Sequence, residues 1–496
     1  MRNWYEELVA LFKDRIGKGE TAGTAYDTAW VASIPDPEQP DRPAFPQALE
    51  WLRLHQHSDG SWGAEIEYYH DRVLSTLVAC IVLAEWHIDE WAEYQIEAGL
   101  RSIWRNVTNL KRDTCMPIGF ELILPTLLGR AKALNFQLPY PCFSDYEEEQ
   151  KRKLAKLPPE LIYSRYVSST FSFEFLGDLF DPSQLGQDAI QEGNGSIAAS
   201  PSATSYFVRK TGATSAMEYI RKVVTEAHGA VPTVAPIDIV ELGWSLYNLY
   251  LVDECYPPEA ARCNSQLEDL WSSHGVAYSR FFSAPDLDDT AVAFAAQSRA
   301  GHQPDPGVFT LFEKDDHFQC FPYERDPSVS VHVHLLDALS VCADFPEKPR
   351  MVRKAIDFLR RTQVYGAFWF DKWHTSPYYT TAHAINAALG IAPDLVGDGI
   401  AWLVQTQRPD GSWGALKGTA EETAYALQAL AVYTRHGGKV KPATLQHGLA
   451  FLEQSVERRN LGYPLLWVSK TLYSPKWVVH SAVLGAMVMV QTVLDG

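Results

Sequence analysis

A repeated pattern of glutamine and tryptophan constrains the fold of this chain more than any other feature. In each copy an aromatic residue and a leucine precede a glutamine, and a tryptophan follows six residues after that glutamine. A glutamine amide can bond backbone at a neighbouring helix end while the indole packs over it. We therefore expect helix hairpins tied into a ring. The copies are Trp51-Leu52 with Gln56 and Trp62, Phe358-Leu359 with Gln363 and Trp369, and Trp402-Leu403 with Gln407 and Trp413. Trp62 and Trp413 are expected to be staples of this kind.

Helical periodicity dominates elsewhere, as at Ala48, Trp51, Leu52 and His55, which follow the i, i+3, i+4, i+7 spacing of a helix face. Strict alternation is short and rare, although residues 329–335 alternate locally. The last two copies of the repeat start 44 residues apart, and the first lies 307 residues upstream of the second. We predict an all-α protein with two helical toroids, divided near residues 225–235, where Gly-Ala-Val-Pro-Thr interrupts the pattern.

Composition excludes several classes of function. The formal charge of −18 gives no basic footprint for nucleic acid, and it disfavours permanent docking on an anionic membrane. The seven cysteines are odd in number and have no Cys-x-x-Cys spacing, which favours a reducing compartment. The acidic N-terminus does not resemble a signal peptide, and the apolar runs at 77–84 and 482–490 are far short of a membrane span. We expect a soluble, cytoplasmic protein with no integral membrane segment.

The segment around Asp286, Asp288 and Asp289 carries the strongest chemical signal. A loop with Pro285 leads into a helix whose first turn holds these three carboxylates. One aspartate would suffice as a helix cap, and crowded carboxylates cannot all ionise. A retained proton in a dry cavity is a possible general acid, able to protonate even an alkene. The 12% of aromatic residues could then stabilise a carbocation through their ring faces.

These residues carry a resemblance to a known family. The stretch 286–291, Asp-Leu-Asp-Asp-Thr-Ala, resembles the D-x-D-D-T-A signature of class II terpene cyclases, and the glutamine–tryptophan repeats are similar to those of squalene-hopene cyclases. Further similar segments run from about residue 24 to 480, and the overall likeness is to bacterial two-domain diterpene cyclases. They include residues 24–32, 69–72, 116–121, 200–203, 371–374 and 378–383.

The resemblance implies two α-barrels, called β and γ, with the active site between them. Residues 1–22 would form the first helix of the β domain, 23–230 the inserted γ domain, and 231–496 the rest of the β domain with the acid motif. It implies class II cyclisation, an isomerase reaction, of a small isoprenoid substrate. The default is geranylgeranyl diphosphate closed to a labdane- or halimane-type bicycle with the head group retained. No D-D-x-x-D motif for diphosphate ionisation is present.

The resemblance also suggests roles for single residues. Asp288, the middle acid, would be the general acid, held by Asp286 and Asp289. His334 would bond one carboxyl oxygen, with His332 as the competitor, since strand-like alternation would point both the same way. Aromatic candidates for the substrate cavity are Trp369, Trp373, Tyr378, Tyr379, Tyr425 and Trp467, although for any single ring plain core packing is the simpler explanation. Glu421 and Glu422 mark a helix start that either faces the cavity or is a solvated cap.

The head-group region departs from the plant relatives. Where they carry an acidic stretch thought to hold Mg²⁺ and diphosphate, this chain has Lys111, Arg112 and Asp113. Asp113 alone offers too few oxygen ligands for Mg²⁺. Lys111 and Arg112 could instead bind an anionic head group of the substrate directly, or they could be solvated surface charges. The rival substrate is therefore a geranylgeranylated aromatic acid, a meroterpenoid precursor, closed to several rings without diphosphate.

Other classes fit the sequence less well. Glycoside hydrolases on helical toroids use separated carboxylates, whereas these acids share one helix turn. A prenyltransferase subunit needs a zinc set, and His374 and His383 lack the spacing of zinc ligands. A non-catalytic helical scaffold would not need clustered acids. Mg²⁺ is the one possible cofactor, no organic cofactor is implied, and partner proteins are unknown.

Overall fold

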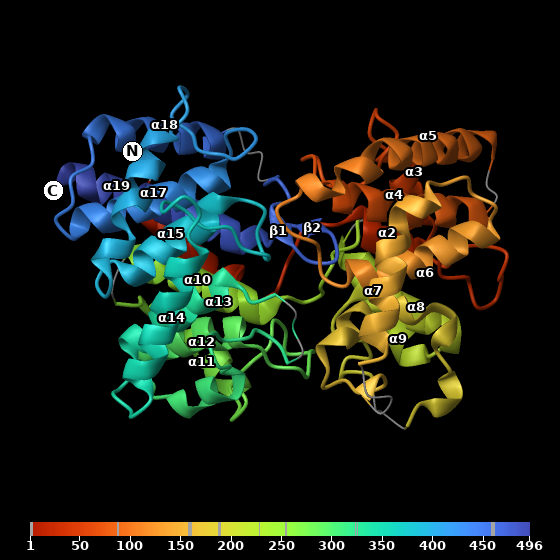
Figure 1. The fold of residues 1–496 in the computed structure, drawn as a ribbon, viewed down its shortest axis with the longest axis horizontal. Coiled ribbons are helices and arrows are strands. Elements are labelled where there is room, and N and C mark those ends of the chain that lie inside the picture. The colour runs from red at the N-terminus through yellow and green to blue at the C-terminus, as the bar shows by residue number, and fades with distance from the viewer. Residues whose placement is uncertain are drawn as a thin grey trace.

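The computed structural model describes residues 3–86, 89–156, 161–186, 190–227, 229–252, 255–322, 324, 326–457 and 462–496. Helices make up most of these residues, and one two-stranded antiparallel sheet is present among them. The prediction of an all-α protein is therefore confirmed. Figure 1 shows two helical lobes side by side, with the short strands between them and both chain ends on the lobe that carries the C-terminal half.

The first lobe is built from the N-terminal half of the chain, except for its first helix, which lies on the second lobe. The α-helices before residue 230 are α1 (Trp4–Asp14), α2 (Ala25–Ala32), α3 (Pro46–Leu54), α4 (Tyr69–Trp86), α5 (Glu90–Asn106), α6 (Phe120–Ala133), α7 (Ser144–Leu154), α8 (Pro201–Thr211) and α9 (Thr214–Ala227). The 3-10 helices among them are η1 (Val107–Arg112), η2 (Tyr140–Phe143), η4 (Ser168–Leu179) and η5 (Pro182–Gln184).

The second lobe carries the acid motif. Its α-helices are α10 (Asp238–Val252), α11 (Ala261–Leu270), α12 (Leu287–Arg299), α13 (Val329–Val341), α14 (Lys348–Thr362), α15 (Pro377–Ala388), α16 (Gly397–Gln405), α17 (Ala420–Arg435), α18 (Pro442–Glu457) and α19 (Lys476–Asp495). The shorter elements are η6 (Pro258–Ala260), η7 (Pro306–Phe312), η8 (Pro393–Leu395), β1 (Trp467–Val468) and β2 (Leu472–Tyr473).

The glutamine–tryptophan repeats are staples, as predicted for Trp62 and Trp413, and Trp369, a candidate for the substrate cavity, makes the same contact. In each copy the indole N–H donates to the carbonyl of the leucine at the preceding helix end, with N···O distances of 2.8 Å for Trp62, 2.8 Å for Trp369 and 2.7 Å for Trp413. The Gln56 amide donates both to the Gly60 carbonyl in its own turn and to the Gln95 carbonyl on α5. Gly60 has a φ of +87°, and a Cβ there would lie 2.5 Å from the Ala98 carbonyl oxygen, so only glycine fits.

A fourth copy of this turn was missed by the sequence analysis. Gln191 donates to the Gly195 carbonyl at 2.9 Å, with the spacing that Gln56 has to Gly60 and Gln407 has to Gly411. Asn194 replaces the aspartate of the turn, and Ile197 stands where the tryptophan would be. The signal was a glutamine followed by Gly-Ser at the right spacing, hidden because the aromatic residue had been replaced.

Two large groups of buried apolar residues underlie the two lobes. One comprises residues from Ala25 to Val231, and the other combines residues of α1 with those that follow Val234, plus a few from the first lobe. The chain passes between the lobes at two adjacent segments, because Gly23 pairs with Pro232 and Thr24 N–H donates to the Val231 carbonyl. On this basis we propose the domain division 1–22, 23–230 and 231–496.

The hairpin of β1 and β2 joins the two lobes through Lys470. This side chain is fully buried, and its Nζ lies 2.9 Å from Glu174 Oε1, 2.7 Å from Ser200 Oγ and 2.5 Å from Ser202 Oγ, all in the first lobe. A buried ammonium is tolerated only when it is paired and hydrogen-bonded. The contact therefore holds the hairpin, and with it Trp467, in a fixed position.

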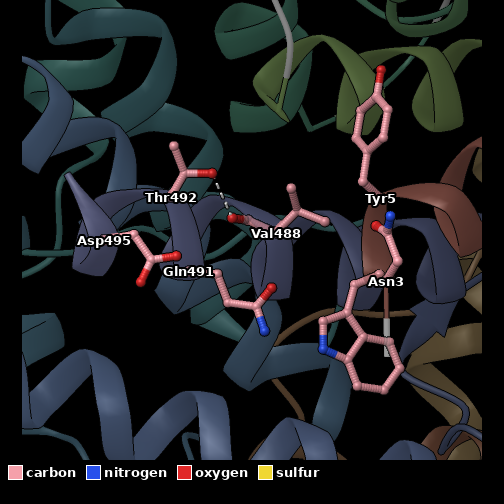
Figure 2. Close-up of a pocket in the computed structure, with 7 residues that line it drawn as sticks. Asn3, Tyr5, Val488, Gln491, Thr492 and Asp495 are labelled. Carbon is pink, nitrogen blue, oxygen red and sulfur yellow. Dashed lines mark hydrogen bonds between the residues drawn. The ribbon is translucent and has the colours of Figure 1, made fainter. Parts of the chain in front are cut away.

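Within the described parts of the chain, one helix, α19, is long and apolar enough to cross a membrane by length and composition, contrary to the expectation from the shorter apolar run. However, 72% of its apolar window is buried inside the protein, as in a core helix. A pocket of about 400 Å³ lies between the N-terminal segment and the end of α19 (Figure 2). Its lining contains none of the acid-motif residues.

Candidate active site

The three aspartates of the acid motif open helix α12. Asp286 is the N-cap, and its Oδ1 accepts the Asp289 backbone N–H at 2.9 Å. Capping therefore explains Asp286, but not its two neighbours, because one cap needs one carboxylate. All three residues are buried, with exposed fractions of 2% for Asp286, 9% for Asp288 and 6% for Asp289. The helix thus presents three acids to an environment that excludes water.

Burial and mutual repulsion favour protonated acids here. Burial raises the pKa of Asp286 to about 6, and burial together with the charge and hydrogen bond of Asp286 raises the pKa of Asp289 well above its usual range. Asp286 Oδ2 and Asp289 Oδ1 have no hydrogen-bond partner among the described residues. The cluster formed by Asp286 and Asp289 can therefore retain a proton near neutral pH.

Asp288 is held by a chain of two histidines. Its Oδ1 lies 2.6 Å from His334 Nδ1, and His334 Nε2 lies 3.0 Å from His383 Nδ1. His383 comes from α15, and burial followed by the neighbouring His334 and His374 lowers its pKa well below the usual range. The two contacts orient the His334 ring, with Nδ1 toward the acid and Nε2 toward His383. If His383 donates its Nδ1–H to His334 Nε2, the proton of a neutral His334 ring lies on Nδ1 and points at Asp288.

His332, the competing candidate, is structural. The Phe318 backbone N–H donates to His332 Nε2 at 2.9 Å, which forces the Nδ1–H to donate to the Ser328 carbonyl at 2.7 Å. The ring stacks on Phe358 with centroids 3.6 Å apart, and burial lowers its pKa to about 3. The segment is helix α13 and not a strand, so residues two positions apart point to different sides of it.

Three of the six predicted cavity aromatics gather around the histidines. Tyr379 lies 6.4 Å from His334 and 5.1 Å from Trp467 between ring centroids, and Tyr425 lies 5.2 Å from Tyr379. Burial raises the pKa of both tyrosines well above the usual range, so they remain neutral phenols. These rings surround the pair formed by Asp288 and His334 with apolar aromatic faces, which can stabilise a nearby cation.

The other three aromatics have different surroundings. Trp369 has the contacts of a staple, and Tyr378 stacks on Trp402 with centroids 4.7 Å apart. Trp373 is half-buried next to the Lys372 ammonium, and its indole N–H has no partner among the described residues. The sequence could not separate these two groups, because the neighbours of each ring come from segments far apart in the chain.

The residues predicted for the head group lie on the first lobe. Lys111 and Arg112 are exposed at the end of η1, and the Arg112 guanidinium lies over the Tyr69 ring. Asp113 caps α4: Oδ1 accepts the Tyr69 N–H, while Oδ2 lies 2.8 Å from the His70 backbone N and 2.7 Å from His70 Nδ1. Both oxygens are engaged, and the described residues contain no group of three His, Cys, Asp or Glu side chains suited to a metal.

Several residues of the site were not predicted from the sequence. Trp244 donates its indole N–H to the Tyr379 hydroxyl at 2.8 Å and meets the His334 ring edge-on at 5.2 Å. Glu192 of the first lobe accepts the Ser283 N–H and O–H, and so braces the loop before the acid motif. The sequence holds no local signal for these residues, because each contact joins segments far apart in the chain.

The arrangement suits proton donation to a substrate without a lone pair. Asp288 accepts a hydrogen bond on one oxygen, which leaves the other to carry a proton. When that proton leaves, the carboxylate is stabilised by the His334 N–H. The rings around it can then stabilise the cation that forms.

The chain is similar to known proteins over nearly its whole length. A profile of the squalene-hopene cyclase C-terminal domain matches residues 325–461. A type B diterpene cyclase from Mycobacterium tuberculosis is 38% identical over 503 residues, which cover 97% of this chain and 98% of that protein.

Solved structures have the same architecture. An ent-copalyl diphosphate synthase from Streptomyces platensis superposes with a TM-score of 0.80 at 26% identity, covering 98% of this chain and 99% of that one. The Arabidopsis thaliana enzyme, solved in complex with (S)-15-aza-14,15-dihydrogeranylgeranyl thiolodiphosphate, gives a TM-score of 0.73 at 25% identity. The match covers 98% of this chain and 63% of that longer chain.

Proposed function

The chain belongs to the class II diterpene cyclases, and we propose that it cyclises geranylgeranyl diphosphate to a labdane- or halimane-type bicyclic diphosphate with the head group retained. The observation that carries this proposal is the buried pair of Asp288 and His334 within a ring of aromatic side chains. The names of the similar diterpene cyclase and copalyl diphosphate synthases support the diphosphate substrate.

The reaction begins when Asp288 gives its proton to the terminal alkene. The electron pair of the double bond forms the new C–H bond, and the tertiary cation left behind is attacked by the next alkene, which closes the first ring. A second closure gives the bicyclic cation, and proton loss forms the final double bond. His334 stabilises the Asp288 carboxylate through the 2.6 Å hydrogen bond. We propose that Asp286 and Asp289 keep the cluster protonated.

The aromatic side chains support the cation stage. Tyr379, Tyr425 and Trp467 surround the acid and histidine pair, and attraction between a cation and a ring face contributes about 0.5–2 kcal/mol per ring. Their burial also keeps water away from the cation, which water would otherwise capture.

The residues proposed to meet the head group are Lys111 and Arg112. Lys111 and Arg112 are exposed and carry the charge needed to meet a diphosphate or a carboxylate. The contacts of Asp113 do not fit a Mg²⁺ ligand, since both of its oxygens are used by helix α4 and His70, and we derive no step through a metal. A geranylgeranylated aromatic acid remains the second candidate substrate. It is favoured only because this chain has Lys111 and Arg112 where the plant relatives have an acidic stretch. We further propose that the protein acts in the cytoplasm.

Incubation of the purified protein with each substrate, with and without chelator, tests the function. The expected result is a bicyclic diphosphate from geranylgeranyl diphosphate, identified by mass spectrometry after dephosphorylation. Chelator separates metal-assisted binding of the head group from the acid chemistry, which needs no metal. Turnover of the aromatic acid with geranylgeranyl diphosphate left unchanged would contradict the proposal.

A further inference from the structure

Two adjacent buried glutamates open helix α17, and their contacts differ. Glu422 belongs to the helix cap: Thr419 Oγ1 accepts its backbone N–H at 3.1 Å and donates to its Oε2 at 2.8 Å. Glu422 Oε1 accepts the Ser376 hydroxyl at 2.5 Å and the Ala415 N–H at 2.8 Å. Both carboxylate oxygens of Glu422 therefore accept hydrogen bonds from neighbouring residues, so Glu422 is a structural residue.

Glu421 has a different arrangement, with three donors on one oxygen. Its Oε1 lies 2.8 Å from Trp467 Nε1, 3.1 Å from His374 Nε2 and 3.2 Å from the Tyr425 hydroxyl. The Ser376 N–H donates to His374 Nδ1, so the proton of the neutral His374 ring is on Nε2 and points at Glu421. The indole can only donate. These donors fit an acceptor-only carboxylate.

The second oxygen of Glu421 has no partner. The residue is 0% exposed, and Oε2 makes no hydrogen bond within the described parts of the chain. A buried acceptor left unpaired costs about 1–3 kcal/mol of folding stability. Folding alone therefore gives no reason to retain a glutamate at this position. Helix capping does not explain it either, because Thr419 is the cap of α17 and Glu422 completes it.

Glu421 belongs to the same cluster of rings as the acid. Trp467, its indole donor, packs 6.3 Å from Trp244 and 5.1 Å from Tyr379 between centroids, and both of those rings contact His334. Glu421 is thus separated from the Asp288–His334 pair by one layer of aromatic side chains. A substrate that lies along these rings after protonation at one end would have its later cationic centres nearer Glu421.

We propose that Glu421 Oε2 is the base that ends the cyclisation, an inference that rests on the proposed function. A C–H bond next to the cationic carbon breaks, its electron pair forms the product double bond, and the proton passes to Oε2. Asp288 adds one proton and Glu421 removes one, so substrate and product are isomers. The three donors on Oε1 hold the carboxylate in place while Oε2 acts.

Replacement of Glu421 by glutamine tests this role. Glu421→Gln keeps the size of the side chain and an acceptor for the three donors but removes the base. We expect substrate consumption to continue, while the bicyclic cation leaves by other routes, as alkene isomers or as an alcohol formed with water. The ratio of these products to the wild-type alkene should rise at least about 10-fold, equivalent to about 1.4 kcal/mol in the partition. Glu421→Asp should retain the wild-type alkene at a lower rate.

Glu422→Gln is the matched control, expected to lower the melting temperature without changing the product ratio. A Glu421→Gln protein with the wild-type product ratio and rate would overturn the inference. So would a folded Glu421→Gln protein, checked by circular dichroism, that consumes no substrate, since the carboxylate would then act before the cation exists. Failure of the wild type to form any bicyclic product would instead contradict the proposed function.

Discussion

His334 Nδ1 lies 2.6 Å from Asp288 Oδ1, and this contact joins two helices whose residues are 46 positions apart in the chain. We propose that this contact distinguishes Asp288, as the proton donor, from the two other acids in the same helix turn. The same ring reaches His383 through its other nitrogen. We propose that proton release from Asp288 is coupled to this buried pair of histidines.

Asp288→Asn should abolish cyclisation and leave the fold intact. The amide has the shape of the acid but cannot deliver a proton, so we expect a loss of about 10²–10⁴-fold in kcat, the range attributed to a positioned general acid. Product formation by gas chromatography–mass spectrometry measures the loss, and circular dichroism checks the fold. Near wild-type turnover would show that another aspartate is the acid.

His334→Ala should slow the reaction by about 10–100-fold, the loss expected for a hydrogen bond to a charged group, with the product unchanged. His383→Phe keeps the ring that stacks on Tyr247 at 4.8 Å and should give a smaller loss. His332→Gln is the control, expected to reduce stability and not to change the pH–rate profile. Full activity of His334→Ala from pH 5 to 8 would rule out its role.

Activity should fall as pH rises. The pKa of Asp286 is raised to about 6 by burial, and that of Asp289 is raised well above its usual range by burial and by Asp286. Each carboxyl group is protonated below its pKa and ionised above it. As the pH rises, the cluster therefore loses its protons, and kcat/KM should decline on the alkaline side. Asp289→Asn should shift the alkaline limb of the profile. A superimposable limb in this variant would show that the cluster does not set the pH dependence.

Asp286→Asn should stabilise the protein near neutral pH. A carboxyl whose folded pKa is about 6 instead of the usual 3.8 favours folding when protonated, and this contribution is lost as pH rises from about 4 to 6. The buried charge then costs up to about 3 kcal/mol, whereas asparagine caps a helix equally well and does not titrate. The melting temperature of the variant relative to wild type should therefore be higher at pH 7 than at pH 4. The opposite order would contradict the raised pKa.

Lys470→Met should weaken the contact between the two lobes. Removal of the ammonium leaves Glu174 as an unpaired buried charge, which typically costs about 3–5 kcal/mol. The measurement is denaturant unfolding, and the double variant with Glu174→Gln should recover part of the loss. A Lys470→Met protein as stable as wild type would show that the buried pair does not hold the hairpin.

The sequence by itself determined the helical class, the staples and the acid motif. Each of these depends on a pattern within about ten neighbouring residues: a helix period, a turn that needs glycine, or a capped first turn. The sequence predicts the staples at Trp62 and Trp413 because each tryptophan bonds a backbone carbonyl only ten residues upstream. The acids of 286–289 were readable because one turn holds all three.

The tertiary structure decided which of the similar residues act together. His332 and His334 are alike in sequence, but the helical geometry of α13 sends one to Phe318 and the other to Asp288. Glu421 and Glu422 are neighbours, and only the packing of Trp467 and Thr419 separates them. Lys470 meets Glu174 across 296 positions. Contacts of this kind arise from the packing of whole helices, and no local pattern encodes them.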